Sequence, residues 1–234
     1  MSTKYFVLTK PKNKPVNDNT ENQIVYLNNI IHILPQVNID YYVKFGLFES
    51  GLIEWTKQLC NKNKTMLDIG AHSGTYALSC AEFCDKVYAF EPQKMTYYSL
   101  CGGVALSNIN NIECVNFGLG SNEQVGTKQL NIVSNDGGGS SLINNTNVIR
   151  TENIEVRTLD SFNIKNIGFI KMDVEDNELN VLKGAIETLK QSNYPSILFE
   201  SNKINNELFN FLIELKYKIL SINGVNNMFL ATYN

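Results

Sequence analysis

The stretch Met66-Leu-Asp-Ile-Gly-Ala-His-Ser-Gly-Thr-Tyr76 decides the fold of this 234-residue chain. Thr65–Gly70 is a short apolar run typical of a buried strand, and Tyr76–Cys84 has the pattern of a helix. Between them, Gly70 and Gly74 let the backbone approach a ligand closely where a Cβ atom would clash. The N–H groups that begin the helix then face an anionic or carboxylate group of that ligand. The stretch predicts a ligand-binding turn between strand and helix, although a plain glycine corner gives the same pattern.

Strand and helix patterns alternate along the rest of the chain. Such alternation predicts βαβ units and a parallel sheet with helices on both faces. Near the end, Lys218–Ile222 and Met228–Thr232 are joined by the turn signal Asn223-Gly224, which predicts an antiparallel hairpin at one edge. The other predicted strands are Lys86–Phe90, Ile112–Phe117, Ile167–Asp173 and Ser196–Glu200, and the other predicted helices are Lys94–Ser107, Leu179–Ser192 and Asn205–Lys216.

The length of the chain suits one well-buried domain, which we place at residues 61–234. Residues 1–60 are expected to form an N-terminal lead-in and a helical cap, with a helix over Gly51–Cys60. Residues 121–160 interrupt the alternation with two strand-like pieces around a glycine-rich segment. Because an insertion after the third strand lies at the carboxyl edge of the sheet, where α/β proteins bind ligands, we expect a substrate-facing flap. The strand-like pieces are Lys128–Val133 and Ile154–Leu159, and the glycine-rich segment is Asn135–Ser141.

Composition limits the partners and the location of the protein. A net charge of −3 and a pI near 5.5 give no attraction for phosphate backbones, so we expect no nucleic-acid partner. No apolar run approaches the roughly 20 residues that span a bilayer, and the N-terminus lacks a signal-peptide pattern, so we expect a cytoplasmic protein without membrane contact. Cys80 and Cys84 are expected to be buried free thiols, because no second Cys or His pair completes a metal site. Apolar surface over residues 24–45 suggests a homodimer contact.

A second signal, Phe90-Glu91-Pro92, ends the next predicted strand. A carboxylate there can accept hydrogen bonds from both hydroxyls of a ribose. In the first turn the spacing is Gly-x-x-x-Gly after an acidic residue, whereas a nicotinamide-binding turn has Gly-x-Gly-x-x-Gly. The two signals together favour S-adenosylmethionine, whose methionine part carries a cationic amino group and a carboxylate. The cofactor-binding residues predicted from the two turns are Asp68, Gly70, Ala71, His72, Ser73, Gly74, Thr75, Glu91 and Pro92.

Acidic residues gather where the fourth strand meets its helix. Asp173 and Glu175 are expected to face the cleft, where they accept a substrate proton or hold a divalent metal ion that the reaction does not require. Glu200 ends the neighbouring strand and is expected to bind a sugar hydroxyl or to act as the base. His72 is either a further proton acceptor or a turn residue bonded to backbone. These four residues are the predicted catalytic groups.

In their order and spacing, these segments resemble the FkbM family of S-adenosylmethionine-dependent methyltransferases, from about Gly46 to Glu200. The resemblance implies a Rossmann-like class I methyltransferase fold with a seven-stranded, mostly parallel sheet, and O-methylation of sugars or polyketide-type hydroxyls. It departs from the family at His72, where an asparagine is usual, and at Asp176, where a glycine is usual. The motifs are Gly46-Leu-Phe-Glu49, Leu67-Asp-Ile-Gly-Ala-His-Ser-Gly74, Phe90-Glu-Pro92, Gly138-Gly-Ser-Ser141, Thr158-Leu-Asp160, Ile170-Lys-Met-Asp-Val-Glu175, Leu182-Lys-Gly-Ala185 and Leu198-Phe-Glu200.

The resemblance also implies roles for residues outside the two turns. Glu49 and Asn116 are expected to contact the cofactor, and Gly138, Ser140 and Ser141 of the flap are expected to contact the substrate.

The sequence therefore predicts an S-adenosylmethionine-dependent O-methyltransferase. Its acceptor is expected to be a small molecule or a glycan, with a nucleotide-linked or glycan sugar as the first hypothesis. The Asn/Asp-Pro-Pro-Tyr signature of many amino-group methyltransferases is absent, which favours oxygen over nitrogen acceptors. Two alternatives are a catalytically silent binding protein on the same fold and a nicotinamide-dependent oxidoreductase.

Overall fold

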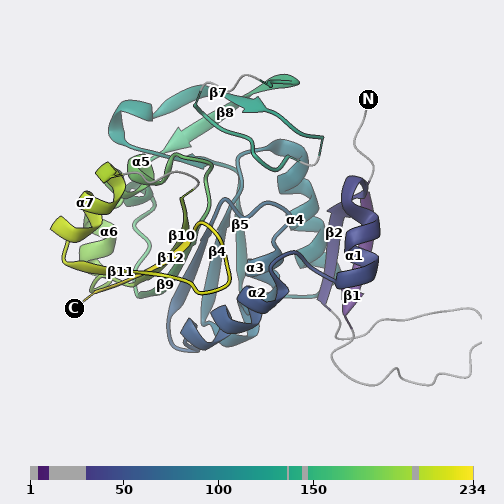
Figure 1. The fold of residues 1–234 in the computed structure, drawn as a ribbon, viewed down its shortest axis with the longest axis horizontal. Coiled ribbons are helices and arrows are strands. Elements are labelled where there is room, and N and C mark those ends of the chain that lie inside the picture. Colours follow the sequence, from purple (N-terminus) through teal and green to yellow (C-terminus); the bar gives the residue numbers. More distant parts are fainter. Residues whose placement is uncertain (1–4, 11–29, 136, 144–146, 202–205, 234) are drawn as a thin grey trace, which may run out of the picture.

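The computed structural model describes residues 5–10, 30–135, 137–143, 147–201 and 206–233. Within these ranges, a seven-stranded sheet has the order β11-β12-β10-β9-β3-β4-β5 (Figure 1). The five strands from β10 to β5 are parallel, and β12 is antiparallel to both of its neighbours, which confirms the predicted sheet and its terminal hairpin. The strands are β3 (Thr65–Ile69), β4 (Lys86–Phe90), β5 (Ile112–Val115), β9 (Ile167–Met172), β10 (Ser196–Glu200), β11 (Tyr217–Ser221) and β12 (Met228–Tyr233).

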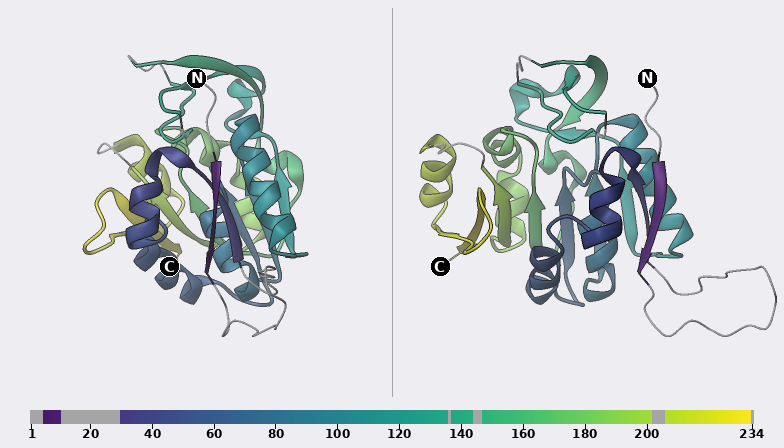
Figure 2. Two further views of the ribbon diagram at one scale, coloured as in Figure 1. Left: turned by 90° about the vertical axis from the view of Figure 1, so that its right-hand side faces the viewer. Right: turned by 45° about the vertical axis from the view of Figure 1, so that its right-hand side comes forward.

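Helices cover both faces of this sheet, as predicted (Figure 2). One layer contains α2, α3 and α4, and the other contains α5, α6 and α7. The helices are α1 (Ile39–Phe45), α2 (Ser50–Thr56), α3 (Thr75–Cys80), α4 (Lys94–Leu106), α5 (Glu178–Lys183), α6 (Ile186–Gln191) and α7 (Asn206–Glu214). Single 3₁₀ turns lie at Gln36–Asn38, Lys57–Leu59, Ala81–Phe83, Asn122–Gln124 and Leu159–Phe162.

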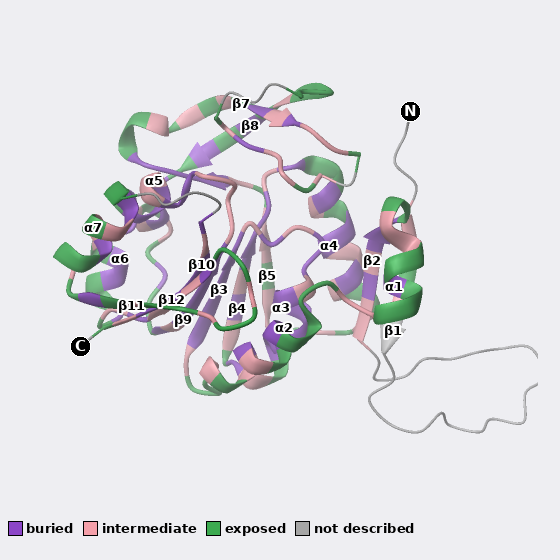
Figure 3. Cartoon of the chain, viewed as in Figure 1, coloured by how far each residue is buried: buried purple, intermediate pink, exposed green. Residues whose placement is uncertain are grey.

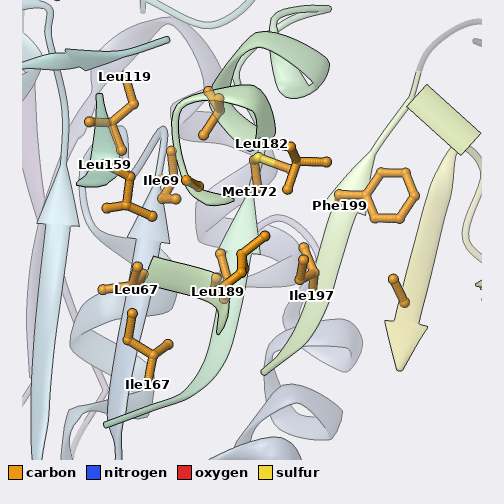
Figure 4. Packing of buried hydrophobic residues seen from close by; sticks show 14 of the residues in the cluster. Leu67, Ile69, Leu119, Leu159, Ile167, Met172, Leu182, Leu189, Ile197 and Phe199 are labelled. Atoms are coloured by element: carbon orange, nitrogen blue, oxygen red, sulfur yellow. The ribbon is translucent and has the colours of Figure 1, made fainter. Parts of the chain in front are cut away.

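Alternate residues of the central strands build two separate cores. In β3, which is buried along its whole length (Figure 3), Met66 packs toward α2, α3 and α4, whereas Leu67 and Ile69 pack toward α5, α6 and α7. Figure 4 shows the second core, where residues from β3, β9 and β10 meet Leu182 of α5 and Leu189 of α6. Each fully buried side chain of this size contributes about 1.5–3 kcal/mol, so the two cores fix the strand ends that carry the site.

The N-terminal segment differs from the predicted helical cap. Besides α1 and α2 it contains an antiparallel pair of strands, β1 (Tyr5–Lys10) and β2 (Ile30–Pro35). Strand β2 packs closely on α4 at Gly102 and Gly103, which have no side chains to hold the strand away. A Cβ atom at Gly103 would lie 3.0 Å from the Ile31 carbonyl oxygen. Most of the polar lead-in lies outside the described residues.

The helix predicted over Leu179–Ser192 is two helices, α5 and α6, separated at Gly184 and Ala185. The backbone is pressed against a neighbouring loop there, since a Cβ atom at Gly184 would overlap the carbonyl oxygen of Gly120. The Gly184 carbonyl leaves the helical pattern and accepts a hydrogen bond from the Asp160 N–H at 3.0 Å. Tertiary packing thus ends a helix that local sequence would continue.

The inserted segment, together with two residues just before it, forms a small sheet above the carboxyl edge (Figure 1). Its strands are β6 (Gly118–Leu119), β7 (Gly126–Ile132) and β8 (Arg150–Arg157), in the order β6-β8-β7. The third large-sheet strand ends at Val115, before the predicted Phe117, because the chain rises here into the flap.

Other predictions concern thiols and membranes. Cys80 and Cys84 are buried free thiols, as predicted. None of the helices in the described ranges is both long and apolar enough to cross a bilayer.

Candidate active site

A cavity at the carboxyl edge of the sheet brings most of the predicted segments together. Its volume of ≈ 280 Å³ is close to the lower end of small-molecule sites. The turns after β3, β4 and β9 form its floor, and the segment before α2 and the flap complete the wall. The predicted residues on the wall are Glu49, Gly70, Ala71, His72, Thr75, Glu91, Pro92, Gly138, Ser140, Asp173 and Glu175; those outside it are Asp68, Ser73, Gly74, Asn116, Ser141 and Glu200.

The turn after β3 depends on its glycines. Gly70 has a φ of +78°, and a Cβ atom there would overlap the carbonyl oxygen of Asp173. The N–H groups of Gly70 and Ala71 both donate to the Phe90 carbonyl, at 3.0 and 2.9 Å, which ties this turn to the end of β4. Gly74, with a φ of +80°, is the N-cap residue immediately before α3. A ligand can therefore approach the backbone closely along this turn.

Asp68 lies behind the cavity wall and is completely buried. One carboxylate oxygen accepts the Ala77 N–H at 2.9 Å, which fixes the first turn of α3, and the other oxygen has no hydrogen-bond partner within the described residues. Burial raises the pKa of Asp68, and the Lys171 charge opposes this rise. Asp68 therefore positions the start of α3 and does not face the cavity.

Glu91 projects into the cavity from the end of β4 and is only 7% exposed. Its two oxygens accept the backbone N–H groups of His72 and Gln93, each at 2.8 Å. Burial raises the pKa of Glu91 to about 7 although both N–H groups oppose this. Each carboxylate oxygen keeps a second lone pair, so the group can still accept two hydroxyl donors. The Asn116 amide holds this strand end by donating to the Glu91 carbonyl at 2.9 Å.

Three carboxylates converge beside the turn after β9. Asp173, Glu175 and Glu200 each offer one oxygen, and these oxygens lie within 4.8 Å of one another. Burial, followed by the charge of Asp173, raises the pKa of Glu200 to about 8. Burial is the largest single influence on Asp173 and would raise its pKa, but the charge of Lys171 and the hydrogen bonds to the carboxylate together outweigh burial and hold this pKa below its usual range. The arrangement can retain a proton between carboxylates or hold an oxygen-binding cation such as Mg²⁺.

Lys171 is a site residue that the sequence analysis missed. Its ammonium lies 3.3 Å from an Asp173 oxygen, 3.5 Å from the Gly70 carbonyl oxygen and 5.1 Å from the centre of the Tyr76 ring. Burial alone would lower the pKa of Lys171, but the surrounding carboxylates hold it above its usual range. A lysine inside an apolar strand was the available signal, because lysine is rarely buried without a partner.

The flap is bonded to the acidic turn. The Gly139 N–H donates to the Glu175 carboxylate at 3.1 Å, and the Ser141 hydroxyl donates to the Glu175 carbonyl at 2.7 Å. Ser140 lies on the cavity wall, and its hydroxyl donates to the Gly137 carbonyl at 2.6 Å. Ser141 therefore anchors the flap, while Ser140 is the serine that a ligand can reach.

The N-terminal segment closes another side of the cavity. Glu49 has a φ of +54°, and its carboxylate accepts a hydrogen bond from the Tyr76 hydroxyl at 2.8 Å. His72, in the glycine turn, has a φ of +50°, and its ring Nδ1 lies 3.1 Å from the Ser73 hydroxyl oxygen. Both residues have left-handed backbone conformations, which residues other than glycine adopt at a cost in free energy.

Part of the cavity wall is apolar, which the sequence analysis did not predict. Residues of the sheet and of the flap strands contribute, and together they can cover a flat apolar group. They are Phe90, Phe117, Leu119, Leu130 and Ile154.

A comparison of the sequence with protein-family models identifies the family. A model of the FkbM methyltransferase domain matches residues 68–219, which is more than half of the chain. The chain belongs to the FkbM methyltransferase family. Membership of the FkbM family supports methyltransferase function and S-adenosylmethionine as the cofactor. It also weighs against the nicotinamide alternative. No curated protein matches the sequence.

Solved structures show the same fold as this FkbM family member. The methyltransferase FkbM from Methylobacillus flagellatus aligns with a TM-score of 0.53 and 20% identity, over 74% of this chain and 44% of that one. The chain thus spans less than half the length of that protein. The precorrin-6y C5,15-methyltransferase from Geobacter metallireducens aligns with a TM-score of 0.51 and 11% identity, over 80% of this chain and 88% of that one. At these identities the likeness shows the fold alone.

Proposed function

We propose that the protein is an S-adenosylmethionine-dependent methyltransferase that methylates a hydroxyl group. The observation that supports this most is a single cavity that combines an open glycine turn, a buried carboxylate at the end of β4 and the two carboxylates after β9, with the Glu200 carboxylate of β10 beside them. The first two features suit an adenosyl amino acid, and the third suits removal of a hydroxyl proton.

The cavity residues fit this cofactor. S-adenosylmethionine, when bound, supplies an electrophilic methyl group on a positively charged sulfur. The lone pairs left on Glu91 suit a ribose diol, and the apolar wall around Phe117 suits an adenine ring. The glycine turn and the start of α3 present backbone to a carboxylate. The acids on the wall favour a ligand that carries two positive groups.

The carboxylates differ in their fitness as a base. An alcohol proton is held too tightly to leave unaided, so a positioned group should accept it while the carbon–oxygen bond forms. Asp173 is stabilised as an anion by Lys171 at 3.3 Å, which makes it a weak base. Glu200 lies outside the cavity wall but within 4.8 Å of the Asp173 and Glu175 oxygens, and burial raises its pKa to about 8, which makes it a stronger base than Asp173 and our preferred acceptor. Glu175 and His72 remain the other candidates.

Two measurements test the proposal. Calorimetry with S-adenosylhomocysteine and, separately, with NAD should show binding of the first only. Transfer of a labelled methyl group to a panel of alcohols and sugars should then fall about 100-fold or more in Glu200→Gln, because general bases contribute about 10²–10⁴-fold. The exposed Glu187→Gln, on α6, is the matched control.

The outcomes separate the alternatives. Binding of S-adenosylhomocysteine without transfer to any acceptor would indicate a silent binding protein. Loss of transfer on adding a chelator, restored by Mg²⁺, would assign the three carboxylates to a metal ion instead of a proton.

A further inference from the structure

The segment before α2 exposes several large apolar side chains. The sequence analysis expects a homodimer contact over residues 24–45, of which 24–29 lie outside the described residues. Strand β2 is not the exposed part, because His32 and Leu34 are buried. The exposed apolar residues lie instead on β1 and along α1 and its two flanks, and we call them the N-terminal face. They are Val7, Val37, Tyr41, Val43, Phe45 and Phe48, each at least 38% exposed.

Three aromatic rings of this face are packed against one another. The Tyr41 ring stacks on Phe48 with ring centres 4.0 Å apart and an interplanar angle of 17°, and the Phe45 ring lies 5.1 Å from Tyr41. Rings held in this way lose little conformational freedom when a partner covers them. Contiguous exposed apolar groups of this kind mark interaction sites on folded proteins. The N-terminal face is therefore prepared for a contact.

Strand β1 has an unpaired edge. It pairs with β2 on one side, and no strand within the described ranges pairs with its other side. Both views in Figure 2 show β1 and α1 on the outer surface of the molecule. The first four residues of the strand, Tyr5–Leu8, are apolar or aromatic and include neither a charge nor a proline. Such an edge is a template for pairing with a strand of another chain.

The charges of α1 are complementary to themselves. Asp40 and Lys44 lie one turn apart and are exposed, and neither forms an ion pair with another described residue. Contacts across a two-fold axis are reciprocal. In an antiparallel pair of α1 helices, Asp40 of each copy therefore lies opposite Lys44 of the other. One acid and one base in this arrangement suit a second copy, whereas an anionic membrane attracts clusters of lysine and arginine.

We propose that the protein is a homodimer in which β1 and α1 of one copy pack against the same elements of a second copy across a two-fold axis. Antiparallel pairing of the two β1 strands joins the two strand pairs into one sheet, and the two α1 helices cover each other's exposed rings. Tyr42 and Phe48 of this segment also line the cavity, so the contact holds one wall of the site in place. The dimer does not depend on the proposed methyltransferase function.

The mass of the full-length chain in solution tests the dimer. Sedimentation equilibrium over a range of concentrations should give twice the chain mass of 26.4 kDa. A monomer at every concentration would overturn the proposal. A monomer that sediments with vesicles of phosphatidylglycerol would also overturn it, because the N-terminal face would then bind lipid.

Charge-swapped variants locate the contact on α1. Asp40→Lys places like charges opposite each other twice in a two-fold dimer, so the dissociation constant of the dimer should rise at least about tenfold. Combining Asp40→Lys with Lys44→Asp exchanges the two signs and should return this constant to within about threefold of the parent value. The matched control is Glu187→Lys, at an exposed position of α6. Equal constants for Asp40→Lys and the control, or a double variant that stays dissociated, would overturn the two-fold arrangement.

A third variant tests the strand edge. Val7→Lys places a charge on β1, and because charged side chains on an edge strand oppose pairing, the dissociation constant should rise at least about tenfold. Val125→Lys, at an exposed valine before β7, should leave it unchanged. Far-UV circular dichroism checks that each variant keeps the parent's secondary structure. A folded Val7→Lys chain that dimerises as tightly as the parent would overturn the pairing of the β1 strands.

Discussion

The turns after β3 and β9 touch each other at the floor of the cavity, yet they are built in opposite ways. In the first, two of the three residues with positive φ are glycines, Gly70 and Gly74, and the third is His72. In the second, Glu175 and Asp176 have φ of +53° and +71° although neither is glycine, and three carboxylates crowd together. The first turn makes room for a ligand mainly with glycines, and the second holds two neighbouring acidic residues in left-handed backbone. We infer that the first turn binds the cofactor and the second carries the chemistry.

The largest effect should follow from filling the first turn. Gly70→Ala places a Cβ atom on the Asp173 carbonyl oxygen at a φ of +78°. We expect a loss of more than about 4 kcal/mol in the free energy of unfolding, or loss of S-adenosylhomocysteine binding if the turn shifts. Urea unfolding and calorimetry measure the two. Gly51→Ala in α2, where nothing lies within 4 Å of the new Cβ atom, should be neutral or stabilising. Equal behaviour of the two variants would contradict the tight contact.

A smaller effect is expected where the first turn is held to β4. Glu91→Gln keeps the shape but replaces one acceptor oxygen with an NH₂ group that faces a backbone N–H. This should weaken S-adenosylhomocysteine binding by about 1.5–3 kcal/mol, or roughly 10- to 100-fold in Kd. Affinity within twofold of the parent chain would show that Glu91 does not hold the ribose.

The acidic groups at and just after the second turn should make the stability of the protein depend on pH. Glu178, at the start of α5, is 2% exposed, and burial raises its pKa to about 7. Its folded-state pKa exceeds the unfolded value, so the protein loses stability as pH rises from about 4.5 to about 7. Glu178→Gln should therefore match the parent at pH 4 and exceed it by about 1–3 kcal/mol at pH 8. Chemical unfolding at both pH values decides this, and a constant difference would exclude the mechanism.

The smallest effect makes the second turn resemble the first. Asp176→Gly supplies the residue that a φ of +71° favours. We expect a net gain of about 0.5–1 kcal/mol in unfolding free energy, because left-handed backbone costs a residue with a side chain about 1–2 kcal/mol and the greater entropy of glycine in the unfolded chain offsets about 0.5–1 kcal/mol of this. A shift of thermal midpoint to lower temperature would mean that the Asp176 side chain makes contacts worth more than the strain.

The sheet could be predicted because its strands are encoded locally. Thr65–Ile69 and Ser196–Glu200 are apolar runs beside helical patterns, and each became a buried strand. The pair β1 and β2 could not be predicted in the same way, because Tyr5 pairs with Pro35 across a long stretch of chain. The break at Gly184 likewise comes from its contact with Gly120 and is invisible to local periodicity.

The site divides in the same manner. Acids and glycines that end predicted strands, such as Gly70 and Glu91, were found because the carboxyl edge gathers them. The sequence did not predict which polar side chains face the cavity and which lie behind its wall. Asp68 accepts a hydrogen bond from α3 behind the wall, and Asn116 donates one to the backbone of Glu91. Lys171 was overlooked because strand periodicity treats it as a core position.

A crystal structure of the full chain with S-adenosylhomocysteine tests the central claim most directly. We predict the amino acid part against the turn at Gly70, the ribose hydroxyls on the Glu91 carboxylate and the adenine among the apolar residues near Phe117. Ligand bound elsewhere, or bound in this cavity with its ribose away from Glu91, would contradict the account.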